Sequence, residues 1–261
     1  MSLAGEERKQ IILNMIQLQG KVRSPELAAK LEVSSETIRR YLEELELENK
    51  LKRVYGGAVK INVEREEPVY VQREVLQAAE KRQIGNAAAA LVQDKEVIVL
   101  DDGTTTLQMI DMLALKSQLT ILVTSVYTLN LLIAYKNRGV FDGEIVLLGG
   151  RVNPKHYRTS GSLAIHFMSY FHVDKAFIVA DGLQIDGGVT SYEDERAMLS
   201  RAFMKQAKQT IVLADHTKIG TNHYCRIAGL EEVDIIISNV APPKEWKDKL
   251  DEKDIHWIVA E

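Results

Sequence analysis

Five segments of the chain place hydroxyl groups, glycines and charged groups directly after short apolar runs. The clearest is Asp101-Asp102-Gly103-Thr104-Thr105-Thr106, which follows the run at 97–100. The other four supply Thr124, Gly149-Gly150-Arg151, Asp181-Gly182, and Asp215 with Lys218. Glycine-rich turns, backbone N–H groups and hydroxyls bind phosphate oxygens, and Arg or Lys balances the charge. Each segment alone would also suit a turn, a capped helix or a surface pair, but together they predict a site for a small phosphorylated polyol.

A second group of polar side chains lies near the N-terminus, in a segment with helical spacing. Ile38 would face the core there, and the polar members are Ser34, Ser35, Thr37, Arg39 and Arg40. Arginine can pair with two acceptors on guanine, and hydroxyls bind phosphates or base edges. Residues 43–48 are mostly acidic and would be repelled by DNA, so only the first half of the segment should enter a groove. Taken alone, Glu36 and Arg40 would form an ordinary exposed ion pair.

Three short helices account for the first part of the chain. Hydrophobic spacing predicts a helix from Glu6 to Gln19 that ends at Gly20. Ser24-Pro25-Glu26 indicates the start of a second helix with Ser24 as its N-cap. The third helix, which carries the polar group, should run from Ser34 to about Asn49, a residue that suits a left-handed C-cap.

Two short strands follow the helices, at 51–55 and 58–61, joined by a turn at Gly56-Gly57. Lys52, Arg53 and Lys60 make this hairpin basic. Three helices and a basic hairpin are typical of a winged helix-turn-helix, whose third helix enters the major groove. We therefore predict a DNA-binding domain over residues 1–61, with Lys52 and Arg53 of the wing among its contacts.

The rest of the chain has the pattern of an α/β domain. Residues 62–75 are predicted to form a polar linker around Pro68, and residues 76–261 a separate domain. A helical pattern covers about Tyr70 to Val92, and apolar runs predict strands at 97–100, 120–123, 144–148, 176–179, 210–213 and 233–237. Runs that are apolar on both faces and separated by helices indicate a mostly parallel sheet covered on both sides. The polar segments should then meet at the carboxyl edge of that sheet.

Composition excludes several classes of protein. The chain has 261 residues, 46% of them hydrophobic, and a net charge of −4, which excludes global disorder. Basic residues exceed acidic ones by two in residues 1–60, whereas the remainder has six more acidic than basic residues. The single cysteine, Cys225, excludes an internal disulfide and a Cys-rich metal site. With no apolar run of membrane-spanning length and no signal peptide, we expect a cytoplasmic protein that has no contact with membranes.

Metal and cofactor binding are not expected. The spacings of His172, His216, His223 and Cys225 fit no common zinc signature. No Ser-His-Asp pattern of a hydrolase is present either.

Several short motifs of the predicted DNA-binding domain occur together at one characteristic spacing. They are Glu7-Arg8, Ile11-Ile12, Gly20-Lys21-Val22, Glu26-Leu27-Ala28, Val33-Ser34, Thr37-Ile38-Arg39-Arg40 and Leu51-Lys52-Arg53-Val54-Tyr55-Gly56-Gly57-Ala58. In these motifs the chain resembles the DeoR family of bacterial transcriptional regulators. The family usually has Asp at the position of Tyr41 and often His at that of Tyr55. We interpret Tyr41, at the edge of the core face, as a change in packing or in backbone contact.

The second domain resembles the sensor domain of the same family. The matching residues are Asp101, Gly103-Thr104-Thr105, Thr124, Gly149-Gly150, Asp174 with Phe177, Gly182, Gly188-Val189-Thr190, Asp215, Lys218 and Gly220. Ser125 stands where the family usually has Asn. The resemblance implies a fold shared with pentose-phosphate isomerases and a site for a sugar phosphate.

The function implied by the resemblance is that of a DNA-binding repressor of a sugar or polyol catabolic operon. A phosphorylated sugar would modulate its DNA binding, and the protein would act as a homodimer or homotetramer on paired half-sites. One alternative is a sugar-phosphate isomerase with an accessory DNA-binding head, in which Asp102, Asp181 or Glu195 is the general base and Lys218 binds the phosphate. Another is a binding module that has lost its ligand and regulates constitutively.

Overall fold

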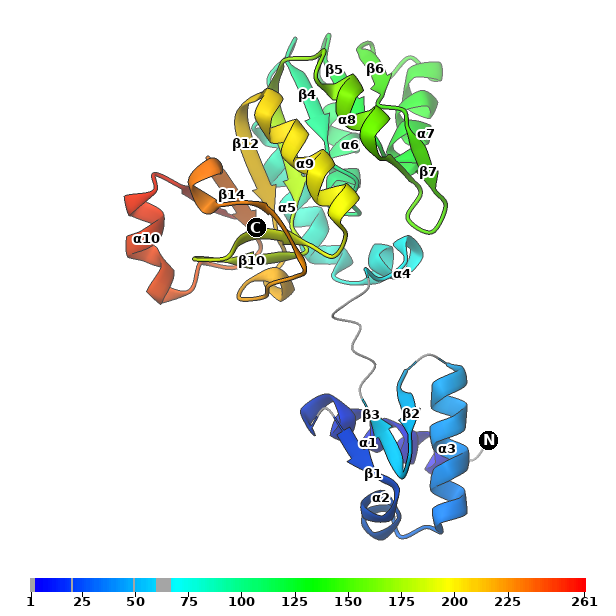
Figure 1. The fold of residues 1–261 in the computed structure, drawn as a ribbon. Coiled ribbons are helices and arrows are strands. Elements are labelled where there is room, and N and C mark those ends of the chain that lie inside the picture. Colours follow the sequence, from blue (N-terminus) through cyan, green and yellow to red (C-terminus); the bar gives the residue numbers. More distant parts are fainter. Residues whose placement is uncertain (1–2, 20, 49, 60–66) are drawn as a thin grey trace. The chain divides into compact units, whose positions relative to one another are not determined.

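The computed structural model describes residues 3–19, 21–48, 50–59 and 67–261. The chain separates into two compact units, residues 1–63 and 64–261, each with its own core (Figure 1). Gly20, Asn49, Lys60 and Ile61, for which the sequence predicts helix ends and part of the wing, lie outside the described residues. So does the linker segment 62–66.

The first unit is a winged helix-turn-helix, as predicted. Its elements are α1 (Leu3–Gln19), β1 (Lys21–Arg23), α2 (Ser24–Leu31), α3 (Ser35–Leu47), β2 (Lys52–Val54) and β3 (Gly57–Val59). The strands form an antiparallel sheet in the order β1-β3-β2. The sequence did not predict β1. It pairs closely with the wing because a Cβ on Gly57 would lie only 2.1 Å from the carbonyl oxygen of Val22, a distance that only glycine tolerates.

The two helix starts of this unit differ from each other. Ser34 caps α3 as predicted, since its hydroxyl accepts a hydrogen bond from the backbone N–H of Thr37 at 3.2 Å. Ser24 is not a cap. Arg23 occupies the N-cap position of α2, and the backbone N–H of Ser24 donates to the carbonyl of Gly56 at 2.9 Å. The hairpin turn therefore satisfies the first backbone N–H of the helix, and no side chain caps this end.

The core of the first unit explains one departure from the family pattern. Ile38, Leu42 and Leu45 of α3 are buried against Leu27 of α2. Tyr41 belongs to the same cluster and is buried too, which agrees with its interpretation as a packing residue.

The second unit is built on a seven-stranded parallel sheet. Its strands are β4 (Val97–Leu100), β5 (Thr120–Val123), β6 (Glu144–Leu147), β9 (Val173–Val179), β12 (Ala207–Leu213), β14 (Ile235–Ser238) and β15 (His256–Val259). They lie in the order β15-β14-β12-β9-β4-β5-β6. The chain therefore builds the sheet outward in opposite directions from the β4–β9 pair. Ligands of such sheets bind where the strand order reverses, beyond the carboxyl ends of the strands.

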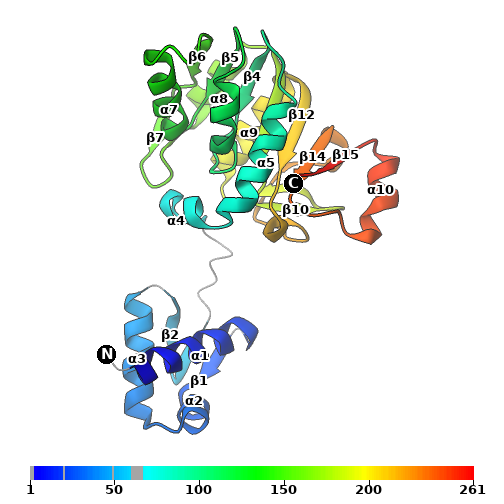
Figure 2. The ribbon, with the colours of Figure 1, turned by 180° about the vertical axis from the view of Figure 1, so that it is seen from behind.

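Helices cover both faces of this sheet. One face packs against α5 (Ala78–Ala90), α6 (Ile110–Leu113) and α7 (Val126–Asn137). The other packs against α8 (Ser162–Met168), α9 (Asp194–Gln206) and α10 (Lys247–Glu252). Figure 1 shows α9 in front of the sheet, and Figure 2 shows α5 in front from behind. Strand residues alternate between the two cores: Ile98 and Leu100 face the first, and Val99 faces the second.

Several short elements of the second unit were not predicted. A hairpin joins β7 (Arg151–Asn153) and β8 (Arg158–Ser160), and β10 (Gly182–Gln184), β11 (Gly188–Ser191) and β13 (Cys225–Ala228) form a small antiparallel sheet. Single 3₁₀ turns cover Thr106–Met109, His216–Lys218, Leu230–Glu232 and Lys244–Trp246. Among the described residues, no helix has both the length and the apolar character needed to cross a membrane.

The helical pattern predicted from Tyr70 to Val92 is divided in two. Helix α4 (Tyr70–Val75) is separated from α5 by Gln77, whose φ of 49° is left-handed. The sequence placed residues 67–75 in the linker, but Glu67 and Tyr70 are buried within the second unit. We therefore propose that the second domain begins near residue 67 rather than residue 76.

Candidate functional site

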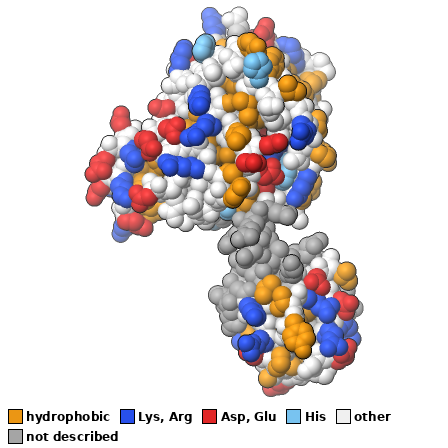
Figure 3. Space-filling model, in the orientation of Figure 1, with side chains coloured by type: hydrophobic (Ala, Val, Ile, Leu, Met, Phe, Trp, Pro, Cys, Tyr) orange, Lys and Arg blue, Asp and Glu red, His pale blue; other side chains and the backbone are white. Residues whose placement is uncertain are grey.

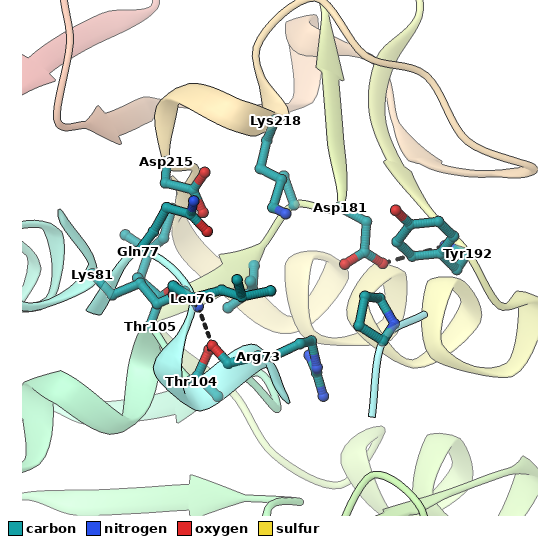
Figure 4. Close-up of a pocket in the computed structure, with 14 residues that line it drawn as sticks. Arg73, Leu76, Gln77, Lys81, Thr104, Thr105, Asp181, Tyr192, Asp215 and Lys218 are labelled. Carbon is teal, nitrogen blue, oxygen red and sulfur yellow. Dashed lines mark hydrogen bonds between the residues drawn. The ribbon is translucent and has the colours of Figure 1, made fainter. Parts of the chain in front are cut away.

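A pocket of the second unit lies at the point where the strand order reverses (Figure 4). The loop after β4 contributes Thr104 and Thr105, and Asp181 follows β9. The chain after β12 adds Asp215 and Lys218, and Figure 4 shows the Lys218 side chain extending into the space between Asp215 and Asp181. The remaining side is closed by Pro68, which precedes α4, and by the segment from α4 to α5 with Arg73, Leu76, Gln77 and Lys81.

Five of the residues predicted at the strand ends line this pocket: Thr104, Thr105, Asp181, Asp215 and Lys218. The backbone N–H groups of Thr104 and Thr105 donate no hydrogen bond within the described part of the chain. The Lys218 amine likewise takes part in no ion pair with any described residue. The pocket thus offers unused N–H donors and a cation on one side.

The other residues of the loop after β4 support it from beneath. A Cβ on Gly103 would lie 2.6 Å from a methyl carbon of Val179, so only glycine lets the loop pack this closely on β9. The hydroxyl of Thr106 donates to the carbonyl oxygens of Asp101 and Gly103 at 2.8 and 3.0 Å. Asp101 and Asp102 are buried in ion pairs.

Five further predicted residues do not line the pocket: Thr124, Gly149, Gly150, Arg151 and Gly182. Thr124 is fully buried after β5, and the Arg151 side chain is exposed with Glu195 at 3.7 Å. These segments follow β5 and β6, which lie to one side of the reversal point. Gly182 starts β10 instead, where a Cβ would lie 2.6 Å from the Thr190 hydroxyl.

Two cations of the pocket, Arg73 and Lys81, come from α4 and α5 and were not predicted. Nη1 of Arg73 lies 2.6 Å from Glu67, while its Nε and Nη2 are buried without a hydrogen-bond partner among the described residues. The Lys81 amine donates to the carbonyls of Arg73 and Leu76 at the end of α4. Burial lowers the pKa of Lys81 to about 8. Both side chains thus have donors that an anion in the pocket could use.

A buried network of ion pairs surrounds the pocket. Arg196 lies 3.7 Å from Asp101 and 3.4 Å from Asp102, and it also pairs with Asp181. Burial raises the pKa of Asp101 to about 6, although Arg196 opposes the shift. Asp181 also accepts hydrogen bonds from the Ser191 hydroxyl and the Tyr192 N–H. The network fixes the orientation of the carboxylate that enters the pocket.

Arg158 extends this network to the segment that follows the linker. It lies 2.9 Å from Asp102, 3.1 Å from Glu67 and 2.5 Å from Glu193. Burial would raise the pKa of Glu67, but the guanidinium groups of Arg196, Arg158 and Arg73 outweigh it and lower this pKa. Glu67 is therefore an anion tied to the protein interior.

Glu67, His156 and Glu193 cluster closely enough to raise the question of a metal ion. The two ring nitrogens of His156, however, face different carboxylates: Nδ1 lies 3.5 Å from Glu67 and Nε2 lies 3.6 Å from Glu193. A metal ion would need both carboxylates beside one nitrogen. Arg158 already pairs with both carboxylates, and burial lowers the pKa of His156. The cluster is therefore better explained as part of the ion-pair network.

The exposed face of α3 carries the predicted DNA contacts. The Arg39 side chain is 69% exposed with Glu36 at 3.4 Å, and that of Arg40 is 66% exposed with Glu44 at 3.9 Å. The ion pair expected between Glu36 and Arg40 is thus replaced by these two weak pairs. Both guanidinium groups can exchange such partners for phosphates or bases at little cost.

Most of the other side chains predicted to contact DNA already bind groups within the protein. The hydroxyls of Ser34 and Thr37 lie 2.9 Å apart and bind each other, whereas Ser35 is exposed. Arg53 of the wing is half-buried, 4.0 Å from both Glu43 and Glu46, and its backbone N–H donates to Glu46. The side chain of Lys52 lies outside the described residues.

Comparison with known proteins agrees with this two-part organisation. The DeoR-like helix-turn-helix domain matches residues 8–64, and the DeoR C terminal sensor domain matches residues 76–240. The HTH-type transcriptional repressor GlcR of Bacillus subtilis is 33% identical over 98% of this chain and 96% of its own length. The glycerol-3-phosphate regulon repressor of Escherichia coli is 26% identical over 91% of this chain and 92% of its own length.

Similarity to solved structures is weaker. Ribose 5-phosphate isomerase A of Neisseria gonorrhoeae matches with a TM-score of 0.39 and 17% identity, over 54% of this chain and 53% of that chain. This level of similarity supports no statement about activity. The two domain matches and the relatives aligned along nearly the whole chain identify the family. The protein belongs to the DeoR family of DNA-binding transcriptional regulators.

Proposed function

We propose that this protein is a repressor whose second unit binds a phosphorylated sugar or polyol in the pocket at the β4–β9 reversal point. The observation that carries this proposal is that the N–H groups of Thr104 and Thr105 and the Lys218 amine lie in one pocket. None of them has a hydrogen-bond or ion-pair partner among the residues that the structure describes. A phosphate group needs both donors and positive charge. Asp181 and Asp215, on the same pocket wall, would accept hydrogen bonds from sugar hydroxyls.

The pocket must open to admit such a ligand. Its cavity volume is about 50 Å³, which accommodates only a few water molecules. We expect the side formed by α4 to move, because the Lys81 amine holds the last carbonyls of this helix and a ligand could compete for that amine. An anionic ligand would attract Lys81 and the unused donors of Arg73, and α4 would lose that hold.

This opening supplies a route to the DNA-binding unit. Helix α4 begins at Tyr70, a few residues after the linker, and Glu67 anchors the intervening segment to Arg73 and Arg158. A ligand that draws Arg73 away from Glu67 would release this anchor. Because a ligand shifts only equilibria between states that it binds differently, the displacement of α4 is the structural difference that the proposal requires.

DNA binding would use Arg39 and Arg40 of α3, with Ser35 and the wing, on an operator with paired half-sites. We propose a cytoplasmic homodimer or homotetramer, since paired half-sites require paired heads. We do not propose catalysis. The carboxylate that an isomerase would use as a base, Asp181, is held by Arg196, Ser191 and the backbone of Tyr192.

Thermal unfolding with a panel of sugar phosphates tests the pocket. A ligand at about 100 times its Kd should stabilise the protein by roughly 2.7 kcal/mol, which is several degrees of Tm. We expect one phosphosugar to raise the Tm of the wild type and of Lys247→Gln, an exposed control, but not that of Lys218→Gln. An equal rise with the free sugar, or an undiminished rise in Lys218→Gln, would contradict a phosphate site at Lys218.

A further inference from the structure

Helices α8 and α9 carry an exposed apolar surface on the face of the sheet that they cover (Figure 3). Leu163 is 72% exposed, Phe167 40%, Tyr170 69% and Met198 60%. The first three follow one another at intervals of four and three residues, so they share one face of α8 and the turn after it. Such a group of large apolar side chains is typical of an interaction surface.

Two hollows lie between α8 and α9, and Ile165 and Met198 line both of them. One, of about 350 Å³, also includes Ala202, Arg201 and Lys205, and the other, of about 330 Å³, includes Leu163 with Arg151 and Glu195. Phe167 and Tyr170 line neither hollow. Met198 and Leu163 therefore protrude next to depressions that are partly apolar, which allows two copies of this face to interdigitate.

The charges on α9 are also complementary to themselves. Its exposed stripe runs from Asp194 through Met198 to Arg201 and Lys205, so one end is acidic and the other basic. If a second copy of α9 packed antiparallel across a two-fold axis, Asp194 of each helix would face the partner's Lys205. Met198 and Arg201 would lie near the axis.

We infer that the α8–α9 face binds a second copy of this chain, with the two α9 helices antiparallel. This inference rests on the proposed pairing of DNA-binding heads, and it names the surface that would provide it. The charge order along α9 favours a second copy over an unrelated partner, because an isologous contact requires each surface to contain its own complement.

The first test is the mass of the full-length protein in solution, measured by light scattering after gel filtration. We expect Met198→Lys to convert the wild-type oligomer to a species of half its mass, since each new ammonium group would face the partner's Arg201 near the axis. Leu115→Lys is the matched control: Leu115 is 76% exposed but lies after α6, which covers the opposite face of the sheet. It should leave the mass unchanged.

A charge exchange tests the antiparallel register. Asp194→Lys and Lys205→Asp should each weaken the dimer by about tenfold or more, because like charges would then face each other. The double variant restores the opposite charges and should recover the wild-type affinity.

The outcomes separate the surface from the function. An oligomer whose mass and affinity are unaffected by Met198→Lys and by both charge variants would overturn the α8–α9 interface while leaving the proposed pairing intact. A monomeric wild-type protein would overturn both. Single charge variants that weaken the dimer without recovery in the double variant would overturn the antiparallel arrangement.

Discussion

The DNA-binding unit carries the arginines that we propose contact DNA on its surface, whereas the sensor unit buries Arg158 and Arg196 almost completely. Arg39 and Arg40 each make one weak, exposed ion pair, but the two buried guanidinium groups contact five carboxylates between them. Exposed pairs contribute little to folding and exchange readily, while an unpaired buried charge is very costly. The same residue type is therefore free to change partners in one unit and is held in place in the other.

The largest effect should come from breaking the buried network. Arg196→Met would leave Asp101, Asp102 and Asp181 without their shared partner and should destabilise the sensor unit by about 3–5 kcal/mol. Denaturant unfolding followed by tryptophan fluorescence reports this unit alone, because Trp246 and Trp257 both lie in it. The exposed control Arg82→Met should change stability by less than about 0.5 kcal/mol. A comparably small loss in Arg196→Met would show that the network does not stabilise the fold.

The exposed arginines should show the opposite behaviour. Arg39→Ala should lower the affinity for operator DNA by roughly 10- to 100-fold, as expected for a lost base contact of about 1–3 kcal/mol. Its unfolding should match the wild type, since the side chain is largely exposed. Lys50→Ala, just beyond the acidic half of α3, is the control and should change affinity by less than about threefold. Unchanged DNA binding in Arg39→Ala would show that a different surface binds DNA.

The affinity of the pocket for its ligand should depend on pH. Neither set of arginines can produce this dependence, because arginine stays protonated. An anionic ligand favours the charged form of Lys81, but burial lowers the pKa of this amine to about 8 in the free protein. Effector affinity should thus be constant near pH 7 and fall as the pH rises above 8, by up to about tenfold per unit. The ligand's own phosphate has its second pKa near 6 and stays a dianion throughout.

Calorimetric titration between pH 7 and 9 measures this dependence. In Lys81→Met the affinity should be weak and the same at both pH values. A wild-type affinity that stays constant up to pH 9 would mean that Lys81 does not contact the ligand.

The smallest change in DNA affinity should come from the weak ion pair between Glu36 and Arg39 on α3. Glu36→Gln removes the partner of Arg39 and one negative charge from the recognition face, so DNA affinity should rise by about two- to threefold. Anisotropy of labelled operator DNA at low and high salt measures the change. A decrease would indicate that Glu36 itself contacts a base or positions Arg39.

Strand positions could be predicted where apolar runs are continuous. Six of the seven strands of the parallel sheet were located this way. Five of them are interior strands, which are apolar because both of their faces are buried, and the sixth is the edge strand β6. Strand β15, at the opposite edge, was not predicted. The β7–β8 hairpin was missed because its buried residues, Arg158 to Ser160, are polar and satisfied by ion pairs and hydrogen bonds rather than by apolar packing.

The candidate site could be predicted in part for a similar reason. Thr104, Thr105, Asp181 and Lys218, which the strand-end rule suggested, line one pocket because the chain after β4, β9 and β12 meets at the reversal point. Strand order is not visible in the sequence, so the segments after β5 and β6, which do not line this pocket, could not be distinguished from the others. Arg73 and Lys81 precede the sheet, on helices, and no spacing rule directs a helical cation into a pocket.

The central claim is that the pocket of the sensor unit controls the DNA-binding unit. The direct measurement is the affinity of the full-length protein for a duplex that it selects from a random pool, with and without the phosphosugar that raises its Tm. We expect the phosphosugar to change the wild-type affinity by about fivefold or more, within the usual range of allosteric coupling. Lys218→Gln should bind the duplex as tightly as the unliganded wild type and show no response. A wild-type affinity that is the same with and without the phosphosugar, or an equal response in Lys218→Gln, would contradict the account.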